Sequence, residues 1–220
     1  MRVLVACEFS GIVRDAFLAR GHDAWSADLY PAPGPHIHGD VLPHLTAGWD
    51  LLIAHPPCTF LCNSGVRWLY LNDEGLPNKE RFQQVVDGAF FFRKFLEAPI
   101  PRIAVENPVM HRYAQVMVGR GPTQIIQPWQ FGHGEMKTTG LWLKNLPKLR
   151  STKIVSGRES RIHLTPGGKN QWAERSVTYP GIAEAMATQW GEPTDVLEQT
   201  AEDRQIAGGE RADQSGACES

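Results

Sequence analysis

Two short apolar runs, RVLVA at residues 2–6 and DLLIA at residues 50–54, constrain the fold of this chain most strongly. Both are dominated by Val, Leu and Ile and are followed by turn-forming residues, which is typical of strands buried on both faces of a parallel sheet. Between the first run and the strand-like DAWSAD at residues 23–28 lies IVRDAFLARG at residues 12–21, whose apolar spacing predicts a helix. The chain therefore begins as a β-turn-α-β unit.

The rest of the chain continues the alternation of strands and helices. A long helix is predicted over residues 79–96 and a closing helix, YPGIAEAMATQWG, over residues 179–191. Further strands are predicted in RIAVENP at 102–108, TQIIQPWQFG at 123–132 and TGLWLKNL at 139–146. The Pro- and His-rich residues 30–41 are interpreted as a connection. Strands that alternate with helices predict an α/β fold with a mostly parallel sheet and helices on both faces.

The length and composition favour one domain. A chain of 220 residues, 42% of them hydrophobic, can form one well-buried core but is too short for two full-sized domains with linkers. We expect a single domain over residues 1–194, with an irregular basic insertion at 148–172, and an acidic, disordered tail at 195–220. No apolar run approaches the roughly 20 residues that cross a bilayer, so no membrane partner is expected. The four cysteines lack the spacing of a disulfide framework, which favours reduced thiols in a cytoplasm.

The formal net charge of −2 conceals an uneven distribution of charge. Residues 137–175 contain nine Lys or Arg against two acids, a balance of +7, whereas residues 191–220 contain eight acids against two arginines. The basic segment could contact a phosphate backbone, so a nucleic-acid partner is compatible with the nearly neutral total. The alternative is a solvated surface that is merely rich in lysine.

Unusual polar residues gather at the ends of the predicted strands. Asp28 ends the second strand and Asp40 follows a turn, while Glu106 and Asn107 end the strand RIAV. In an open parallel sheet ligands bind beyond the carboxyl ends of the strands, because the loops diverge there and helix N-termini point inward. An acid in the position of Asp28 is placed to accept hydrogen bonds from a ribose. The alternative for both aspartates is an ordinary turn or capping role.

Cys58 directly follows a buried strand and two prolines. Pro56 and Pro57 remove backbone donors and fix the chain, so the loop presents this thiol with little freedom to collapse onto the sheet. A thiol held in this way is a candidate nucleophile, although a cysteine is more often a small buried hydrophobe. The carboxyl of Glu106 at the neighbouring strand end favours the first alternative, because it could act beside the same substrate as a general acid.

Several motifs follow one another along the chain: FSG after the first strand, then Asp28, GDV, PPC, ENP, QFGHGEMKTTGLWL and TYPGIAEAMA. In this order they resemble the motifs of DNA (cytosine-5) methyltransferases, over about residues 2–191. PPC followed by ENP is the most specific part of the resemblance. The chain is similar to a compact phage or prophage-type member of that family, and the resemblance implies the family's Rossmann-like, S-adenosylmethionine-dependent methyltransferase fold.

The resemblance implies covalent catalysis by Cys58. Carbon 5 of cytosine accepts a methyl group from a sulfonium only after the ring has become enamine-like, and addition of a thiolate to carbon 6 achieves this. By similarity, Cys58 is the nucleophile, Glu106 binds or protonates ring nitrogen 3, and Asn107 helps to hold that loop. The cytosine must be flipped out of DNA or come from a single strand, because the thiol cannot reach a stacked base.

The resemblance also implies sites for S-adenosylmethionine and for DNA. The methionine part of the cofactor is expected at the turn after the first strand, its ribose at Asp28, and its adenine beyond the next turn. The expected cofactor residues are Phe9, Ser10, Gly11, Asp28, Asp40, Val41 and Pro56. The expected DNA-contacting residues are Lys137 and, in a loop over residues 59–78 that closes on the base, Asn63, Ser64 and Arg67.

The chain departs from the family pattern in three places. Ile12, Val13 and Arg14 stand where family members carry further glycines, so the cofactor is expected to sit differently there. The segment GHGEMKTTG lacks the usual arginine pair, for which Lys137 is the substitute. Only residues 148–172 stand in place of a large target-recognition domain, which predicts short or relaxed sequence specificity, or help from a partner.

Two other functions stay open on the sequence alone. The same scaffold could transfer a bulkier group, such as carboxymethyl, from a carboxylated S-adenosylmethionine, and the cations Arg14, Arg67 and Lys137 leave room for this. The chain could instead be a non-catalytic nucleic-acid-binding domain that kept the fold and lost the activity.

A few further residues are given no chemical role. His36 and His38 are interpreted as surface residues, and no metal is expected, because neither Cys nor an acid lies at ligand spacing. Cys62, four residues after Cys58, is interpreted as a spare thiol in the loop. His55 is expected only to shape the loop that carries the nucleophile.

Overall fold

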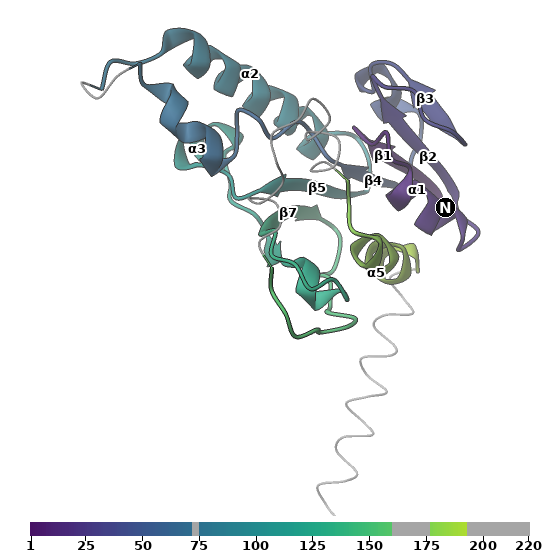
Figure 1. Cartoon of the computed structure of the whole chain (residues 1–220). Coiled ribbons are helices and arrows are strands. Elements are labelled where there is room, and N and C mark those ends of the chain that lie inside the picture. Colours follow the sequence, from purple (N-terminus) through teal and green to yellow (C-terminus); the bar gives the residue numbers. More distant parts are fainter. Residues whose placement is uncertain (72–74, 160–176, 193–220) are drawn as a thin grey trace, which may run out of the picture.

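The computed structural model describes residues 1–71, 75–159 and 177–192, and these form a seven-stranded sheet with helices on both faces (Figure 1). The strands are β1 (Arg2–Ala6), β2 (Asp23–Asp28), β3 (His36–His38), β4 (Leu51–Ala54), β5 (Arg102–Pro108), β6 (Gln124–Ile126) and β7 (Thr139–Lys144). The α-helices are α1 (Ile12–Leu18), α2 (Lys79–Leu96), α3 (Arg112–Val118) and α5 (Pro180–Gly191). Short 3-10 helices follow β3, β4 and β6, and are η1 (Leu42–Thr46), η2 (Asn63–Leu69) and η3 (Pro128–Gln130).

The strands of the sheet are ordered β3-β2-β1-β4-β5-β7-β6. Strand β7 pairs antiparallel with β5 and β6, whereas the other pairings are parallel. The strand order reverses between β1 and β4, which are neighbours although β2 and β3 separate them in the sequence. This is a doubly wound, Rossmann-like arrangement with one antiparallel strand, so the fold class expected from the sequence is confirmed.

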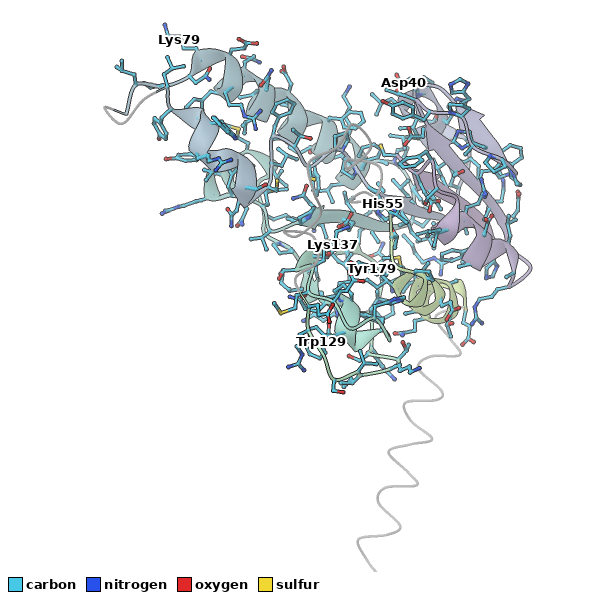
Figure 2. The ribbon with its side chains drawn as sticks, viewed as in Figure 1. Asp40, His55, Lys79, Trp129, Lys137 and Tyr179 are labelled. Carbon is cyan, nitrogen blue, oxygen red and sulfur yellow. The ribbon has the colours of Figure 1, made fainter. Side chains whose placement is uncertain are left out.

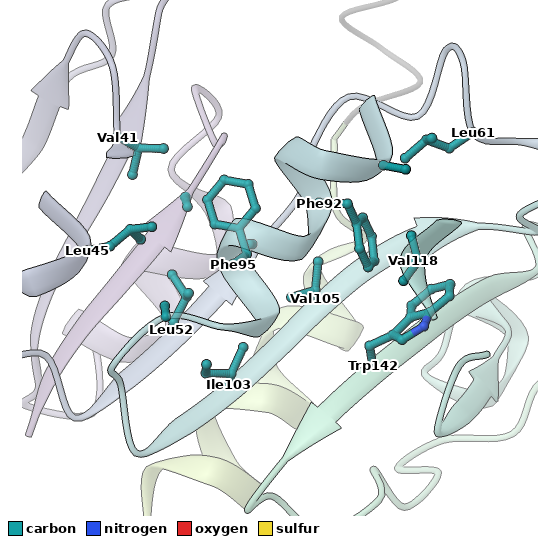
Figure 3. Close-up of a cluster of buried hydrophobic side chains, with 14 of the residues drawn as sticks. Val41, Leu45, Leu52, Leu61, Phe92, Phe95, Ile103, Val105, Val118 and Trp142 are labelled. Atoms are coloured by element: carbon teal, nitrogen blue, oxygen red, sulfur yellow. The ribbon is translucent and has the colours of Figure 1, made fainter. Parts of the chain in front are cut away.

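The central strands supply alternate side chains to the two faces of the sheet, and each face has its own core. On the face shown in Figure 3, Leu52, Ile103 and Val105 lie against Phe92 and Phe95 of α2. The opposite face packs on α1 and α5, and its core includes Val3, Val5, Phe17, Ile53, Ala104, Ala183 and Trp190. Burial on both faces explains why β1 and β4 are continuous apolar runs rather than alternating ones.

Helix α2 spans the range expected from its apolar spacing. The side chain of Asn78 caps it by accepting the Arg81 N–H at 3.1 Å. The Phe92 ring is fully buried and lies edge-to-face on Trp142 of β7, with the ring centroids 5.0 Å apart. The helix therefore packs across the antiparallel strand as well as the parallel ones.

The structure differs from the sequence expectations at three elements. Residues 123–132 form a strand only at β6, because Pro128, which has no N–H, begins the helix η3. The expected connection at 30–41 contains the three-residue edge strand β3, paired with the end of β2. Helix α3 is missing from the expectation because its cap is a histidine: Nδ1 of His111 accepts the Ala114 N–H at 3.1 Å.

The expected domain limits fall only partly within the described residues. Residues 148–159 contain no helix or strand, and they run beside the preceding loop through the bridges Phe131–Lys153 and Glu135–Glu159. The rest of the insertion expected at 148–172 and the tail expected at 195–220 lie outside the described residues. No helix in the described part of the chain is both long and apolar enough to span a bilayer.

Replacing Phe92 with Ala should lower the free energy of unfolding by about 3–5 kcal/mol, because the ring is fully buried between α2 and the sheet. Phe90 lies on the same helix but is 59% exposed, so Phe90→Ala is the matched control and should change stability by about 0.5 kcal/mol or less. Urea denaturation followed by circular dichroism measures both variants. Equal losses would contradict the packing of α2 on the sheet.

Candidate active site

The carboxyl ends of β1, β2, β4 and β5 meet at one edge of the sheet. Backbone hydrogen bonds tie the loops after β1 and β4 to the ends of neighbouring strands: Glu8 N donates to Ala27 O of β2 at 3.1 Å, and His55 N donates to Ala6 O of β1 at 2.9 Å. These loops surround the point between β1 and β4 at which the strand order reverses, where ligands of doubly wound folds bind. The loops that carry the predicted catalytic and cofactor residues therefore emerge on one side of the molecule.

A small cavity lies beside the ends of β4 and β5. Its volume is about 20 Å³, and its walls are formed by His55, Glu106, Ile126, Lys137, Thr139, Thr178, Tyr179, Ile182 and Met186. Figure 2 shows His55, Lys137 and Tyr179 in the same region, beside α5. The cavity has room for about one water molecule and is far smaller than a nucleobase. A larger, open groove of about 500 Å³ between α1 and α5 contains none of the expected site residues.

The electrostatics of the cavity centre on Glu106, whose carboxylate lies 3.3 Å from Nδ1 of His55. Burial raises the pKa of Glu106, but the hydrogen bond from His55 and the positive charge of Lys137 outweigh burial and hold the pKa below its usual value. Glu106 is therefore ionised at neutral pH and accepts the Nδ1 proton of His55. The other ring nitrogen, Nε2, is buried and has no partner among the described residues.

Cys58 lies within range of the same charges. The hydrogen bond with Cys62, burial and the negative charge of Glu106 raise the pKa of the Cys58 thiol, whereas Lys137 lowers it. The structure thus brings the predicted nucleophile and the predicted acid into one region. Cys58 is not among the residues that line the cavity, so the sulfur lies outside the cavity wall in this state.

Asn107, the third expected catalytic residue, is fully buried on β5 and pairs with Gly140 of β7. Its Nδ2 donates to the carbonyl of Pro108 at 2.5 Å. Its Oδ1 is buried without a partner among the described residues. Asn107 does not line the cavity, and its role in holding the loop after Glu106 stays a prediction.

The two aspartates expected at the cofactor lie close to the end of β1. Burial and the negative charges of Asp28 and Asp40 raise the pKa of Cys7 to about 12, so both acids act on this residue. One oxygen of Asp28 accepts the Tyr30 N–H at 2.9 Å, and one oxygen of Asp40 accepts the Leu42 N–H at 3.0 Å. These are turn contacts, and each carboxylate retains capacity to accept hydrogen bonds from hydroxyl groups.

The other expected cofactor residues differ in exposure. Phe9 and Ser10 are half-buried in the turn between β1 and α1. Val41 and Pro56 are buried, and Val41 packs in the same core cluster as Leu45. A ligand could reach these two residues mainly through their backbone.

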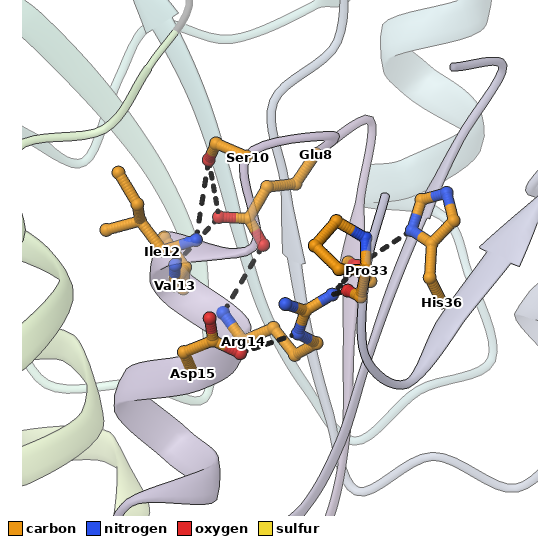
Figure 4. Close-up of polar contacts among 9 residues, drawn as sticks. Glu8, Ser10, Ile12, Val13, Arg14, Asp15, Pro33 and His36 are labelled. Atoms are coloured by element: carbon orange, nitrogen blue, oxygen red, sulfur yellow. Dashed lines mark hydrogen bonds and ion pairs between the residues drawn. The ribbon is translucent and has the colours of Figure 1, made fainter. Parts of the chain in front are cut away.

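Glu8, which the sequence did not single out, organises the turn after β1. Its buried carboxylate accepts the N–H groups of Val13 at 2.7 Å and Arg14 at 3.3 Å, at the N-terminus of α1 (Figure 4). The Ser10 hydroxyl donates to the same carboxylate at 3.3 Å. A negative charge in this position satisfies otherwise unpaired amides and interacts favourably with the helix dipole.

Arg14, which stands where family members carry glycine, is buried between this turn and β2. Its Nη1 donates to Ser26 Oγ at 3.0 Å and to Pro33 O at 2.7 Å, and its Nε donates to Asp15 at 2.8 Å. Gly11 has a φ of 72°, and a side chain there would collide with the Arg14 guanidinium. The Arg14 guanidinium can therefore lie in this position only because residue 11 has no side chain.

Lys137 is the expected DNA-contacting residue that lines the cavity. Its Nζ lies 5.9 Å from the centre of the Tyr179 ring, whose hydroxyl donates to Glu135 at 2.6 Å. Sequence reasoning missed Tyr179 and underrated His55 as cavity residues. The position of His55 directly before the proline pair was a usable signal, whereas the motif around Tyr179 does not show that this residue lines the same cavity as Glu106.

The other expected DNA-contacting residues belong to η2 and do not line the cavity. Ser64 is next to the nucleophile loop, with its Oγ 3.0 Å from Sγ of Cys62. Asn63 and Arg67 are exposed, and the Arg67 guanidinium lies 4.7 Å from the centre of the neighbouring Trp68 ring. Their contact with DNA stays a prediction.

The histidines of β3 have structural partners. His36 Nδ1 is 2.8 Å from Ser26 Oγ, and His38 Nε2 is 3.0 Å from Leu29 O. Within residues 1–71, 75–159 and 177–192, no group of three or more His, Cys, Asp or Glu is arranged to hold a metal ion.

No model of a known protein family matches this chain, and no curated protein matches it in sequence. Solved structures do match it. One is an Escherichia coli protein described provisionally as a DNA modification methyltransferase encoded within a prophage, with 14% sequence identity and a TM-score of 0.43. The match covers 71% of this chain and 52% of the other, so this chain spans about half the length of that protein.

Replacing His55 with Phe should raise the pKa of Glu106, because burial would then act without the hydrogen bond that opposes it. Carbon-13 NMR of the glutamate carboxyl groups, assigned through Glu106→Gln, measures the change. In the wild-type protein the lowered pKa contributes stability that is present at neutral pH and is lost as the pH falls through the folded-state pKa. His44→Phe, outside the cavity, is the control. An unchanged Glu106 pKa in His55→Phe would show that the two groups are not coupled.

Proposed function

We propose that this chain is an S-adenosylmethionine-dependent DNA (cytosine-5) methyltransferase. The observation that carries the proposal is that Cys58, in the loop after β4, and Glu106, near the end of the adjacent parallel strand β5, lie close enough for the charge of Glu106 to act on the thiol. A thiol nucleophile beside a carboxylate and a hydrogen-bonded imidazole suits addition to a pyrimidine ring. The order of the motifs along the chain agrees with this chemistry.

The end of β1 fits a nucleoside cofactor that carries no phosphate. In dinucleotide-binding folds the pyrophosphate binds at the N-terminus of the first helix, but the Glu8 carboxylate already occupies these amides and would repel a pyrophosphate. Asp28 would hold the ribose, Asp40 and the backbone at Val41 the adenine, and residues 9–11 the methionine part. When bound there, S-adenosylmethionine supplies a methyl group on a sulfonium.

In the proposed reaction, Cys58 loses its proton and its sulfur forms a bond to carbon 6 of cytosine. The electron pair of the C5–C6 double bond moves into the ring, and nitrogen 3 takes up a proton from Glu106, which gains that proton from solvent as the base enters and is held by its hydrogen bond to His55. Carbon 5 gains electron density and takes up the methyl group, while the proton on nitrogen 3 returns to Glu106. Loss of the proton on carbon 5 to water and cleavage of the S–C6 bond then restore the aromatic ring and the free sulfur.

The cavity must open before a cytosine can enter, because its present volume of about 20 Å³ is near that of one water molecule. The wall that could move is formed by Thr178 and Tyr179, which precede α5 and are half-buried, whereas Ile182 and Met186 belong to the core. Trp129 stacks with Arg158, whose guanidinium lies 4.2 Å from the ring centre and could contact a phosphate. We therefore propose a flipped or single-stranded cytosine as the substrate.

Plain methyl transfer is favoured over carboxymethyl transfer by the placement of the cations. Arg14 is engaged by Ser26 and Pro33 beneath the turn. Arg67 stacks on its neighbouring tryptophan and does not line the cavity. Of the cations considered for an extra carboxylate, Lys137 alone lies at the cavity, where its charge acts on Glu106.

Protein incubated with DNA and methyl-labelled S-adenosylmethionine should produce 5-methylcytosine, detected by nucleoside mass spectrometry. Cys58→Ser and Glu106→Gln should each lower the rate by about 100-fold or more, because they remove the nucleophile and the group at nitrogen 3. Glu97→Gln, in an exposed pair with Arg93, is the control and should keep wild-type activity.

Three results would argue for other functions. Full activity of Cys58→Ser would exclude the proposed nucleophile. A modified cytosine heavier than the methylated base would identify a carboxylated donor. DNA binding without any modified base would favour a non-catalytic domain.

A further inference from the structure

The loop that carries the proposed nucleophile is held through its backbone carbonyls. Cys58 O accepts the N–H groups of Leu61 and Cys62, both at 3.0 Å, and this closes a turn directly after the proline pair. Leu61 O accepts the backbone N–H of His111 at 2.9 Å. The imidazole of the same histidine lies with its Nε2 2.9 Å from Phe60 O. His111, which belongs to another segment, thus contacts two successive carbonyls of this loop.

The contacts of the His111 side chain fix which ring nitrogen carries the proton. Nδ1 accepts the Ala114 N–H at 3.1 Å, and a nitrogen that accepts a hydrogen bond carries no proton. Nε2 therefore carries the proton and donates a hydrogen bond to Phe60 O. The residue is buried, so both hydrogen bonds are shielded from water. The two nitrogens have different partners: Nδ1 caps α3, and Nε2 holds the nucleophile loop.

The segment that contains His111 also joins the nucleophile loop to the strand that carries Glu106. Asn63 N donates to Val109 O at 2.9 Å. Two residues farther along the chain, His111 N donates in the opposite direction, to Leu61 O. Val109 directly follows the last residue of β5, the strand on which Glu106 lies. The loop with the thiol and the strand with the carboxyl are therefore held together by this short pairing.

A second side chain, Arg81 of α2, also contacts this loop. Its Nη2 donates to Thr59 O at 3.1 Å, and its guanidinium lies 4.4 Å from the centre of the Phe60 ring. Arg81 is only half-buried, whereas His111 is buried and belongs to the segment that follows β5. His111 is therefore the side chain that relates the position of the loop to the position of Glu106.

We propose that His111 is a positioning residue, an inference that rests on the proposed function. Through Nε2 and Phe60 O it holds the loop where the Cys58 sulfur can reach carbon 6 of cytosine while Glu106 reaches nitrogen 3. The imidazole itself neither bonds to the base nor gains or loses a proton in the reaction. Its effect is geometric, because a displacement of about 1 Å at a reacting atom can lower a rate about 100-fold.

Two substitutions separate the two hydrogen bonds of the imidazole. His111→Asn places an amide oxygen near the position of Nδ1 and no atom at the position of Nε2, so it keeps the cap of α3 and loses the link to Phe60 O. His111→Gln places its amide nitrogen near the position of Nε2 and no acceptor at that of Nδ1, so it keeps the link and loses the cap. Each loses one buried hydrogen bond, and both should lower Tm by a similar amount, about 2–4 °C.

The rate of covalent adduct formation with a 5-fluorocytosine oligonucleotide and S-adenosylmethionine should differ between the two variants. His111→Asn should lower the rate about 10-fold or more and leave the Kd for the oligonucleotide unchanged, whereas His111→Gln should restore the rate to within about threefold of wild type. His44→Asn, at an exposed histidine, is the control. Equal rates in the two His111 variants, a slower reaction in His111→Gln, or a wild-type rate in His111→Asn would overturn the proposal.

A second measurement needs neither DNA nor cofactor. Nitrogen-15 NMR of the wild-type imidazoles at about pH 8 should show the His111 ring protonated at Nε2 and not at Nδ1. The amide of Asn63 should exchange with solvent faster in His111→Asn than in His111→Gln. A proton on Nδ1, or equal exchange in the two variants, would overturn the inference. If the wild-type protein forms no adduct, the proposed function fails, and these two measurements alone decide whether His111 holds the loop.

Discussion

The parallel pairing of β4 with β5 is the constraint on which the candidate site depends. Ala54 pairs with Val105, so the next residues, His55 and Glu106, emerge together at the same edge of the sheet with Nδ1 and Oε2 3.3 Å apart. The proline pair then carries Cys58 only three residues farther along the chain. A slip of one residue in this pairing would turn the Glu106 side chain to the other face of the sheet and separate the groups.

The opposite end of the site is built on two buried charges. Glu8 satisfies the amides that begin α1, and Arg14 links the same turn to Ser26 of β2. Together they replace the flexible glycine turn implied by the resemblance, and they leave the helix N-terminus unavailable to a phosphate. Under the proposed function, the ligand contacts at this end come from the acids at the ends of β2 and β3, and the chemistry stays at β4 and β5.

Most of the features that could be predicted from the sequence depend on patterns among residues that are close together in the chain. The apolar runs of β1 and β4 and the spacing of α2 follow from burial and periodicity, and strand ends pointed to Cys58 and Glu106. The antiparallel direction of β7 could not be predicted, because the direction of a strand does not change its pattern of apolar residues. The strand β3 could not be predicted either, because three residues are too few to show a periodic pattern. The contact of Tyr179 with the cavity depends on how α5 packs, which is a property of the whole fold.

The most direct test of the central claim is to locate the bond between this protein and a 5-fluorocytosine oligonucleotide. After incubation with S-adenosylmethionine, proteolysis and peptide mass spectrometry identify the residue that carries the nucleotide. The peptide containing Cys58 should be modified at that sulfur, and Glu106→Gln should greatly reduce the yield. Attachment at Cys62 or at any other residue, or the absence of a covalent adduct, would contradict it.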